Sequence, residues 1–121
     1  MVIGLINGIQ IGDTQLEQLN LFLANKRELA LEYKSFFDGS NIKFRTETSD
    51  TKANYWLMCV ELENLKERDL FLSETNNAKV MTRPIWQLIF KSPLYSGFQK
   101  DEQLNAMNLE DRIVNIPSSV R

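Results

Sequence analysis

The sequence predicts one domain of the α/β class, of the α+β type, with about three helices packed on a small, mainly antiparallel sheet. Two observations favour this fold: a long amphipathic helical pattern near the start, and several short apolar runs that suit strands. The 121 residues, 43% of them hydrophobic and 25% charged, also have the size and composition of an ordinary globular domain. We therefore expect a single hydrophobic core.

The most regular pattern is a helix that starts at a capping box formed by Thr14 and Glu17. Its expected end is near Asp38, because Gly39 readily adopts the left-handed turn that closes many helices. A coiled-coil seam is disfavoured because the pattern lasts about three heptads, so packing on a sheet is the preferred interpretation. The apolar stripe comprises Leu16, Leu19, Leu23, Ala30, Tyr33 and Phe37.

Four runs are expected to be strands. Residues 42–45 alternate as a half-buried strand does, and residues 55–62 are apolar on both faces, which predicts the middle of the sheet. Residues 80–82 predict a short strand that Arg83-Pro84 stops, because proline cannot donate to a sheet ladder. Residues 112–116 predict the last strand.

Two shorter helices complete the expected order α, β, β, α, β, loop, α, β. Asn64 and Glu67 predict a helix that ends near residues 76–77, and Asp101 can cap a helix through about Glu110. The stretch 85–98 is rich in large apolar side chains without a clear period. An exposed apolar stretch often marks an interface, so we expect self-association that buries Trp86, Phe90 and parts of the first helix.

The first residues place Gly4, Gly8 and Gly12 at four-residue spacing, which would align them on one helical face. Docking against a partner and fraying of a chain end are both open interpretations. The start has no basic region and too short an apolar run for a signal peptide or a membrane span. We expect no membrane partner.

The inventory of side chains excludes several classes of chemistry. The sequence has no histidine, which argues against Ser-His-Asp and Cys-His catalysis and most catalytic zinc sites, so no metal is expected. Cys59 is the single cysteine, so no internal disulfide forms and a reducing, cytoplasmic location fits. The net charge of −2 and the scattered basic residues disfavour nucleic acid. Neither a phosphate loop nor a dinucleotide fingerprint occurs.

No complete catalytic constellation remains. Each of the eight lysines lies beside polar residues or at a position predicted to be exposed, so none is expected to form a Schiff base. Acid/base pairs could be drawn from Glu61 with Glu63, or from Glu110 with Asp111. Solvated charge is normal at such positions, and these pairs receive little weight.

A series of segments carries a resemblance to one family. The most specific are residues 82–86, Thr-Arg-Pro-Ile-Trp, and residues 110–119, which run from Glu-Asp-Arg-Ile-Val to Asn-Ile-Pro-Ser-Ser. With residues 15–19, 26–30 and 54–57 they resemble the C-terminal part of the pyridoxal-phosphate (PLP)-dependent DegT/DnrJ/EryC1/StrS aminotransferases, particularly the legionaminic-acid-type 4-aminotransferase branch. The similarity divides the chain into a poorly matched segment, 1–11, and a small domain, 12–121.

The resemblance implies the small domain of a fold-type I aminotransferase acting on 4-keto nucleotide sugars for cell-surface polysaccharide, with glutamate as the usual donor. The family's cofactor-binding aspartate, stacking aromatic residue and Schiff-base lysine all precede the matching region. No catalytic or cofactor-binding residue is therefore expected here, and the chain alone is predicted to be inactive. The expected partners are a large domain or a second copy. The rival hypothesis is a non-enzymatic module that binds itself or another subunit.

Four residues are candidates for substrate binding. Arg83 can bind a diphosphate or carboxylate with two parallel hydrogen bonds, although a structural ion pair is an equally simple role. Tyr55 and Trp86 could form an aromatic wall for a sugar, or simply pack in the core. Phe90 stands where many relatives have a histidine that faces the sugar nucleotide, so substrate contact there would be altered. Residues 115–119 are interpreted first as structural.

Overall fold

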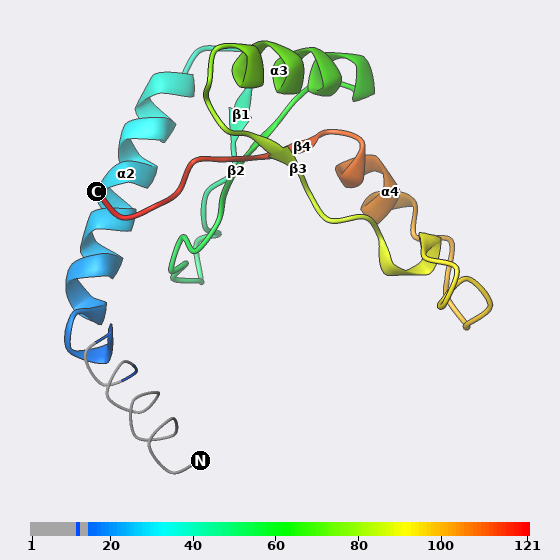
Figure 1. Ribbon diagram of the computed structural model, residues 1–121, viewed down its shortest axis with the longest axis horizontal. Coiled ribbons are helices and arrows are strands. Elements are labelled where there is room, and N and C mark those ends of the chain that lie inside the picture. Colours follow the sequence, from blue (N-terminus) through cyan, green and yellow to red (C-terminus); the bar gives the residue numbers. More distant parts are fainter. Residues whose placement is uncertain (1–11, 13–14) are drawn as a thin grey trace.

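A computed structural model describes residue 12 and residues 15–121 of the chain (Figure 1). The described part follows the predicted order of elements. Thr14, Gly4 and Gly8 lie outside the described residues, so the capping box and the glycine spacing are untested. The elements are α2 (Leu19–Phe37), β1 (Lys43–Phe44), β2 (Met58–Glu61), α3 (Leu65–Asn77), β3 (Arg83–Pro84), the 3-10 turn η1 (Ile89–Lys91), α4 (Leu104–Glu110) and β4 (Ile113–Ile116).

The strands form one antiparallel sheet in the order β1-β2-β4-β3. The long central pairing places Met58 opposite Ile116 and Val60 opposite Val114. The four-stranded sheet and the three α-helices of the described residues confirm the predicted fold class. The interior position of β2 also confirms that the most apolar run lies in the middle of the sheet.

The core lies between one face of the sheet and the C-terminal half of α2. Met58 and Val60 from β2 and Val114 and Ile116 from β4 are buried, because alternate residues of a strand share one face. These four residues pack in one cluster with Leu29, Ala30, Phe44 and Leu62. Partly buried side chains from α2 and α3, among them Tyr33, Phe37, Phe71 and Leu72, complete it.

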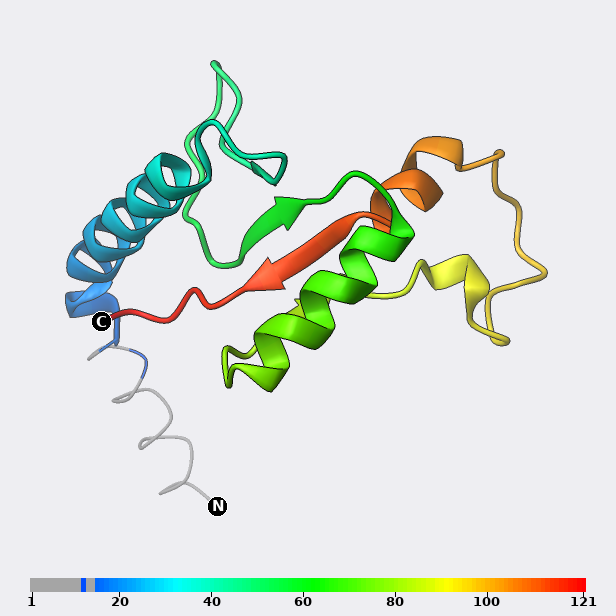
Figure 2. The same cartoon turned by 90° about the horizontal axis from the view of Figure 1, so that it is seen from above.

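Helix α2 satisfies the predicted stripe only in part. Tyr33 and Phe37 pack against the core as expected, but Leu16 and Leu19 are exposed. The reason is the placement of the sheet, which reaches only the C-terminal half of this helix (Figures 1 and 2). The predicted end is confirmed, since Phe37 is the last helical residue and Gly39 has a φ of 78°.

The other helix boundaries follow their capping residues. Asn64 accepts a hydrogen bond from the Glu67 N–H, so α3 begins where the sequence predicts. Helix α4 begins two residues later than the Asp101 cap predicts, because the capping position is Gln103. Gln103 has a left-handed φ of 52° and donates its N–H to Asp101 Oδ1, so this aspartate closes a turn in front of the helix.

The predicted strand at residues 80–82 is wrong, because β3 comprises the two residues that were expected to stop it. Pro84 lies opposite Val114 in an edge strand, where a missing N–H is tolerated. Thr82 is buried and bonded to the end of α3, through Thr75 Oγ1 at 2.6 Å and Asn76 Nδ2. The central strand is also shorter than predicted, because Tyr55 has a positive φ of 50°.

Side chains of α2 bond the segment before β2 and the residues after β4. Lys26 Nζ donates to the carbonyl oxygens of Tyr55, Trp56 and Ser118, and the Tyr33 hydroxyl donates to Pro117 O at 2.9 Å. Ser118 Oγ also donates to Trp56 O. The sequence after β4 therefore satisfies backbone groups, in agreement with its structural interpretation.

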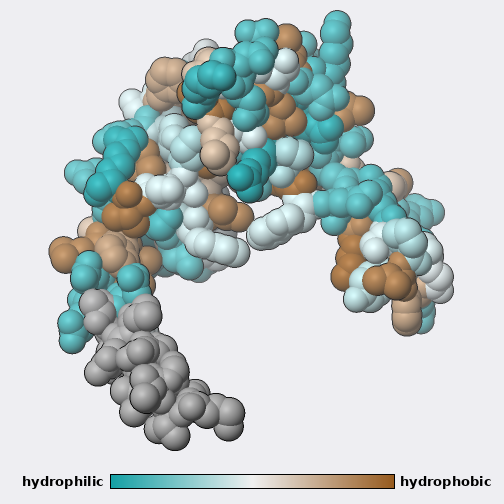
Figure 3. All heavy atoms as spheres, viewed as in Figure 1, coloured by the Kyte–Doolittle hydropathy of each residue, from teal (hydrophilic) through white to brown (hydrophobic). Residues whose placement is uncertain are grey.

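Residues 85–103, called the arm below, connect β3 to α4 and extend away from the sheet. Figures 1 and 2 show the arm and α2 at opposite ends of the sheet. Apolar side chains gather on the arm in the space-filling view (Figure 3). Within the described residues, no helix is long and apolar enough to cross a membrane.

The core predicts the effect of one substitution. Met58 is 1% exposed, so Met58→Ala should lower the free energy of unfolding by about 2–5 kcal/mol through lost burial and a residual cavity. Met81 is 65% exposed, and Met81→Ala should change it by less than about 0.5 kcal/mol. Urea unfolding followed by circular dichroism measures both, and equal effects would contradict the core assignment.

Candidate functional site

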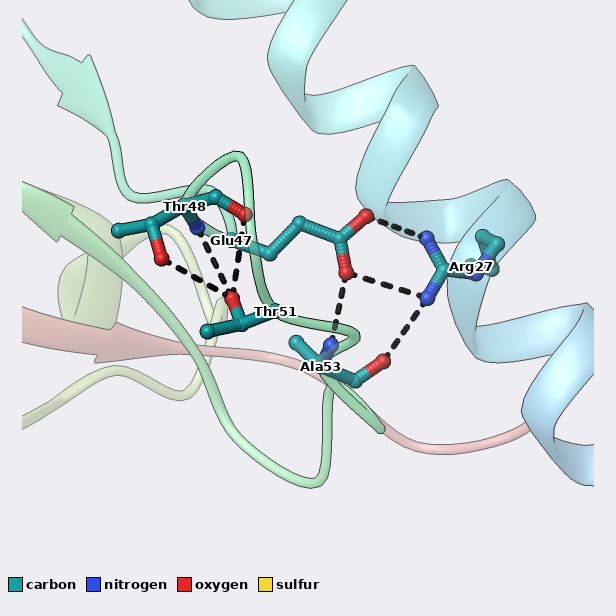
Figure 4. Close-up of polar contacts among 5 residues, drawn as sticks. All are labelled: Arg27, Glu47, Thr48, Thr51 and Ala53. Atoms are coloured by element: carbon teal, nitrogen blue, oxygen red, sulfur yellow. Dashed lines mark hydrogen bonds and ion pairs between the residues drawn. The ribbon is translucent and has the colours of Figure 1, made fainter.

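A partly buried ion pair between Arg27 and Glu47 holds the loop between β1 and β2 against α2 (Figure 4). Arg27 donates from both terminal nitrogens to the Glu47 carboxylate, at 2.7 and 3.2 Å, and its Nη2 also reaches Ala53 O at 3.0 Å. Glu47 Oε2 accepts the Ala53 N–H at 2.7 Å. Thr48 and Thr51 close the tip of the same loop.

Arg27 of this ion pair lines a cleft of about 460 Å³ between α2 and the loop. The bidentate hydrogen bonds of Arg27 hold the pKa of Glu47 below its ordinary value of 4.5, and the Ala53 N–H acts in the same direction. Arg27 is thus neutralised by a partner inside the domain. The remaining lining residues are Asn20, Leu23, Ala24, Lys52, Ala53 and Asn54.

Tyr55, one of the four predicted contact residues, has its ring against the same arginine. The guanidinium carbon of Arg27 lies 5.4 Å from the centre of the Tyr55 ring, within the range of a cation–π contact. Tyr55 is half-buried and packs beside the core cluster. This geometry favours the packing role for Tyr55.

Arg83 is placed differently, because its side chain is exposed at the edge of the sheet. Its Nη2 contacts Met81 Sδ at 3.3 Å, and among residues 15–121 no carboxylate forms an ion pair with it. The alternative role of a structural ion pair is therefore not seen in this part of the chain. Asn115 lies opposite Arg83 on β4, so two polar side chains adjoin at this edge.

Trp86 is the second residue of the arm and is 71% exposed. The aromatic pair in the structure joins Trp86 to Trp56, which is 65% exposed, with ring centres 6.2 Å apart. Sequence reasoning missed Trp56 because it was assigned to the central strand. The available signal was Asn54, a turn former whose Oδ1 accepts the Trp56 N–H.

Phe90 lies in η1 and is half-buried, with Lys100 Nζ 5.3 Å from its ring centre. Arg83, Trp86 and Phe90 follow one another along residues 83–90, and Trp56 lies beside Trp86. Tyr55 belongs to the separate contact with Arg27. The exposed segment offers a cation and aromatic faces, which suit an anionic ligand that also carries a ring.

The groups that could transfer protons are engaged in structural contacts. Glu61 is buried and pairs with Arg45 at 3.0 Å and with Arg112. Burial raises the pKa of the Cys59 thiol, which keeps it protonated and poorly nucleophilic. Neither residue is placed for acid/base or nucleophilic work.

The described lysines either take part in polar contacts or are exposed. Lys26 donates to three carbonyl oxygens, and Lys91 pairs with Glu110. The other six, Lys34, Lys43, Lys52, Lys66, Lys79 and Lys100, are exposed. Among the described residues, no group of three or more His, Cys, Asp or Glu could hold a metal ion.

The Arg27–Glu47 pair predicts a pH dependence. Because folding lowers the pKa of Glu47, its stabilising contribution is full above the unfolded pKa and is lost as the pH falls through the folded pKa. Glu47→Gln should therefore flatten the fall in melting temperature below about pH 4.5. Glu63→Gln, at an exposed site, is the matched control. Identical acid profiles for wild type and Glu47→Gln would contradict this role.

Known structures share this fold. The aminotransferase TlmJ of Streptoalloteichus hindustanus superposes with a TM-score of 0.80 at 17% identity, covering 89% of this chain and 29% of that chain. The Streptococcus pneumoniae protein Spr1654 in its PLP form gives 0.78 at 21% identity, over 90% and 29%. At these identities the likeness shows the fold.

One curated relative has a higher sequence identity to the chain than these two structures have. The chain is 30% identical over 108 residues to the GDP-perosamine synthase of Escherichia coli O157:H7, which covers 89% of this chain and 29% of that relative. The chain thus spans less than a third of the length of this relative. The model of the DegT/DnrJ/EryC1/StrS aminotransferase family matches residues 9–121. This match covers nearly the whole chain, including the segments that carried the resemblance, and the chain belongs to the DegT/DnrJ/EryC1/StrS aminotransferase family.

Proposed function

We propose that the chain is the small, C-terminal domain of a cytoplasmic PLP-dependent aminotransferase that acts on a 4-keto nucleotide sugar in cell-surface polysaccharide synthesis. One observation carries this proposal: the family match extends over residues 9–121, yet the chain spans 29% of the matching relative. The cofactor site and Schiff-base lysine then come from residues outside these 121. The chain alone is inactive because its lysines are exposed or engaged.

The substrate class is supported by the relative and by the exposed segment. The relative is named for a sugar linked to guanosine diphosphate. A diphosphate is an anion that a guanidinium binds with two hydrogen bonds, and Arg83 has no carboxylate partner among the described residues. The Trp56–Trp86 pair offers flat apolar faces to a sugar or base.

Within this proposal Arg83 binds the diphosphate and Trp86 lines the sugar side. Phe90 contributes an apolar edge where many relatives have histidine, so it contacts the sugar without donating a hydrogen bond. Tyr55 acts on the substrate less directly, because its ring already packs on Arg27. The legionaminic-type branch is a narrower prediction, which a panel of 4-keto nucleotide sugars would test.

The decisive experiment separates the chain from a complete enzyme. With PLP and borohydride, intact-mass analysis of the 121-residue chain should show no stoichiometric adduct on lysine. Joined to the segment of the E. coli GDP-perosamine synthase that precedes the matched region, the chain should support amino transfer from glutamate to a 4-keto nucleotide sugar. A stoichiometric adduct on the isolated chain would overturn the proposal that the cofactor lysine lies elsewhere.

The joined protein described in the previous paragraph, called the chimera below, also tests Arg83. Arg83→Gln should raise KM for the nucleotide sugar at least about tenfold, roughly 1.4 kcal/mol, because a charged hydrogen-bond pair to the diphosphate is lost. Arg121→Gln is the matched control, since Arg121 is exposed and pairs with Glu32. Equal KM values for the two variants would remove Arg83 from the substrate site.

The second candidate function is a non-enzymatic module that associates with itself or with another subunit. The apolar side chains of the arm favour it, since Trp86, Ile89, Leu94 and Phe98 are all exposed. The interface would bury Trp86, Phe90 and parts of α2. This surface is equally suited to cover a large domain, and the amino-transfer experiment described above distinguishes the two functions.

The module hypothesis predicts a concentration-dependent dimer of the isolated chain. Sedimentation velocity of wild type should then show a dimer that Trp86→Ala weakens by at least about tenfold in Kd, because an exposed aromatic anchor is lost. Leu70→Ala, at an exposed position of α3 outside the proposed interface, is the control. A monomer at all concentrations would contradict the hypothesis.

A further inference from the structure

Few polar groups attach the arm to the rest of the domain within the described residues. Within the described residues, two hydrogen bonds join residues 88–102 to a residue outside the arm. Leu88 N–H and Lys91 Nζ donate them, and the Glu110 carboxylate accepts both. The remaining bonds of this stretch are local turns, such as Tyr95 N–H to Ser92 O. Within the described residues, a single side chain thus accepts the hydrogen bonds that residues 88–102 donate to the rest of the domain.

Glu110 is the last residue of α4 and is 8% exposed. Its Oε1 accepts the Leu88 N–H at 2.9 Å, and its Oε2 pairs with Lys91 Nζ. Its carbonyl oxygen accepts Arg68 Nη1 of α3 at 2.9 Å. Glu110 therefore contacts the arm through its side chain and α3 through its backbone carbonyl.

The two donors flank the 3-10 turn that contains Phe90. Leu88 is the N-cap of η1 and Lys91 is its last residue, so the carboxylate binds both ends of this turn. Burial by itself raises the pKa of Glu110, but the Lys91 ammonium and the Leu88 N–H outweigh it and hold that pKa below 4.5. The group is ionised near neutral pH, and charged hydrogen bonds are the stronger kind.

We propose that Glu110 is a positioning residue that fixes the arm on the end of α4, and through the arm sets the place of Phe90 and Trp86. The part concerning substrate rests on the proposed function. Glu110 itself touches no substrate in this proposal. Its role depends on the bridge between α4 and η1, not on the acid/base pair with Asp111 that the sequence suggested.

Hydrogen exchange of the 121-residue chain tests the bridge without any substrate. Glu110→Ala removes both contacts and should speed exchange of the Leu88 amide and of peptides from residues 88–102 by at least about tenfold. Glu110→Gln keeps an acceptor for Leu88 but loses the ion pair, so it should lie between Glu110→Ala and wild type. Asp111→Asn, at the exposed neighbouring position, is the matched control.

Circular dichroism first establishes that each variant is folded. If Glu110→Ala does not fold, Lys91→Met removes the ion pair from the exposed side and should loosen the same peptides. Unchanged exchange of residues 88–102 in the folded variants would overturn the proposal. Faster exchange confined to these residues, with β2 and β4 unaffected, supports it.

The chimeric enzyme then separates the bridge from the substrate assignment. Glu110→Gln should raise KM for the nucleotide sugar several-fold with kcat little changed, because the arm is displaced and the reacting groups are not. An unchanged KM together with a loosened arm would leave the bridge in place and remove Phe90 and Trp86 from the substrate site. Failure of the proposed function is thus distinguishable from failure of the bridge.

Discussion

The antiparallel pairing of β2 with β4 is the contact on which the rest of the structure depends. The two strands come from distant parts of the sequence, and their register places Val60 against Val114, both fully buried. This register presents one apolar face to α2, and a shift of one residue would turn that face toward solvent. The edge strands β1 and β3 are only two residues long and gain their order from this pair.

Polar contacts organise the irregular segments around this sheet. Arg27 and Glu47 hold the first loop, Lys26 gathers carbonyl oxygens from two chain segments, and Glu110 holds the arm. Exposed ion pairs usually add little to the free energy of unfolding, so these contacts matter mainly because they fix where the loops lie. Each satisfies backbone groups of a loop that has few apolar contacts of its own.

The division between engaged and available side chains explains why the candidate site lies where it does. Most charged groups near the sheet are paired inside the domain, including Glu61 with two arginines. Arg83 on the edge strand, Trp86 on the arm and Trp56 just before β2 are all exposed. An exposed aromatic and guanidinium surface on a domain that spans 29% of a relative is consistent with a site completed by other residues.

Several elements could be predicted from the sequence because their signals are local. The Asn64 cap, the Gly39 turn and the apolar run of β2 depend on neighbouring residues, and the structure confirms them. The strand at 80–82 failed because pairing with β4, a distant partner, selected Arg83-Pro84 instead. The start of α4 failed because a left-handed Gln103 is not signalled by its residue type.

The sequence by itself determined the fold class, the order of elements, the absence of histidine chemistry and the family resemblance. Only the tertiary structure decided which candidates are available to a ligand. Arg83 and Tyr55 looked alike as site residues, yet Tyr55 packs on Arg27 while Arg83 is exposed. Trp56 pairs with Trp86, about 30 residues away in the sequence. Glu110 binds Leu88 and Lys91, about 20 residues away. Such contacts depend on how β2, β3 and α4 are placed in space, which short-range patterns do not encode.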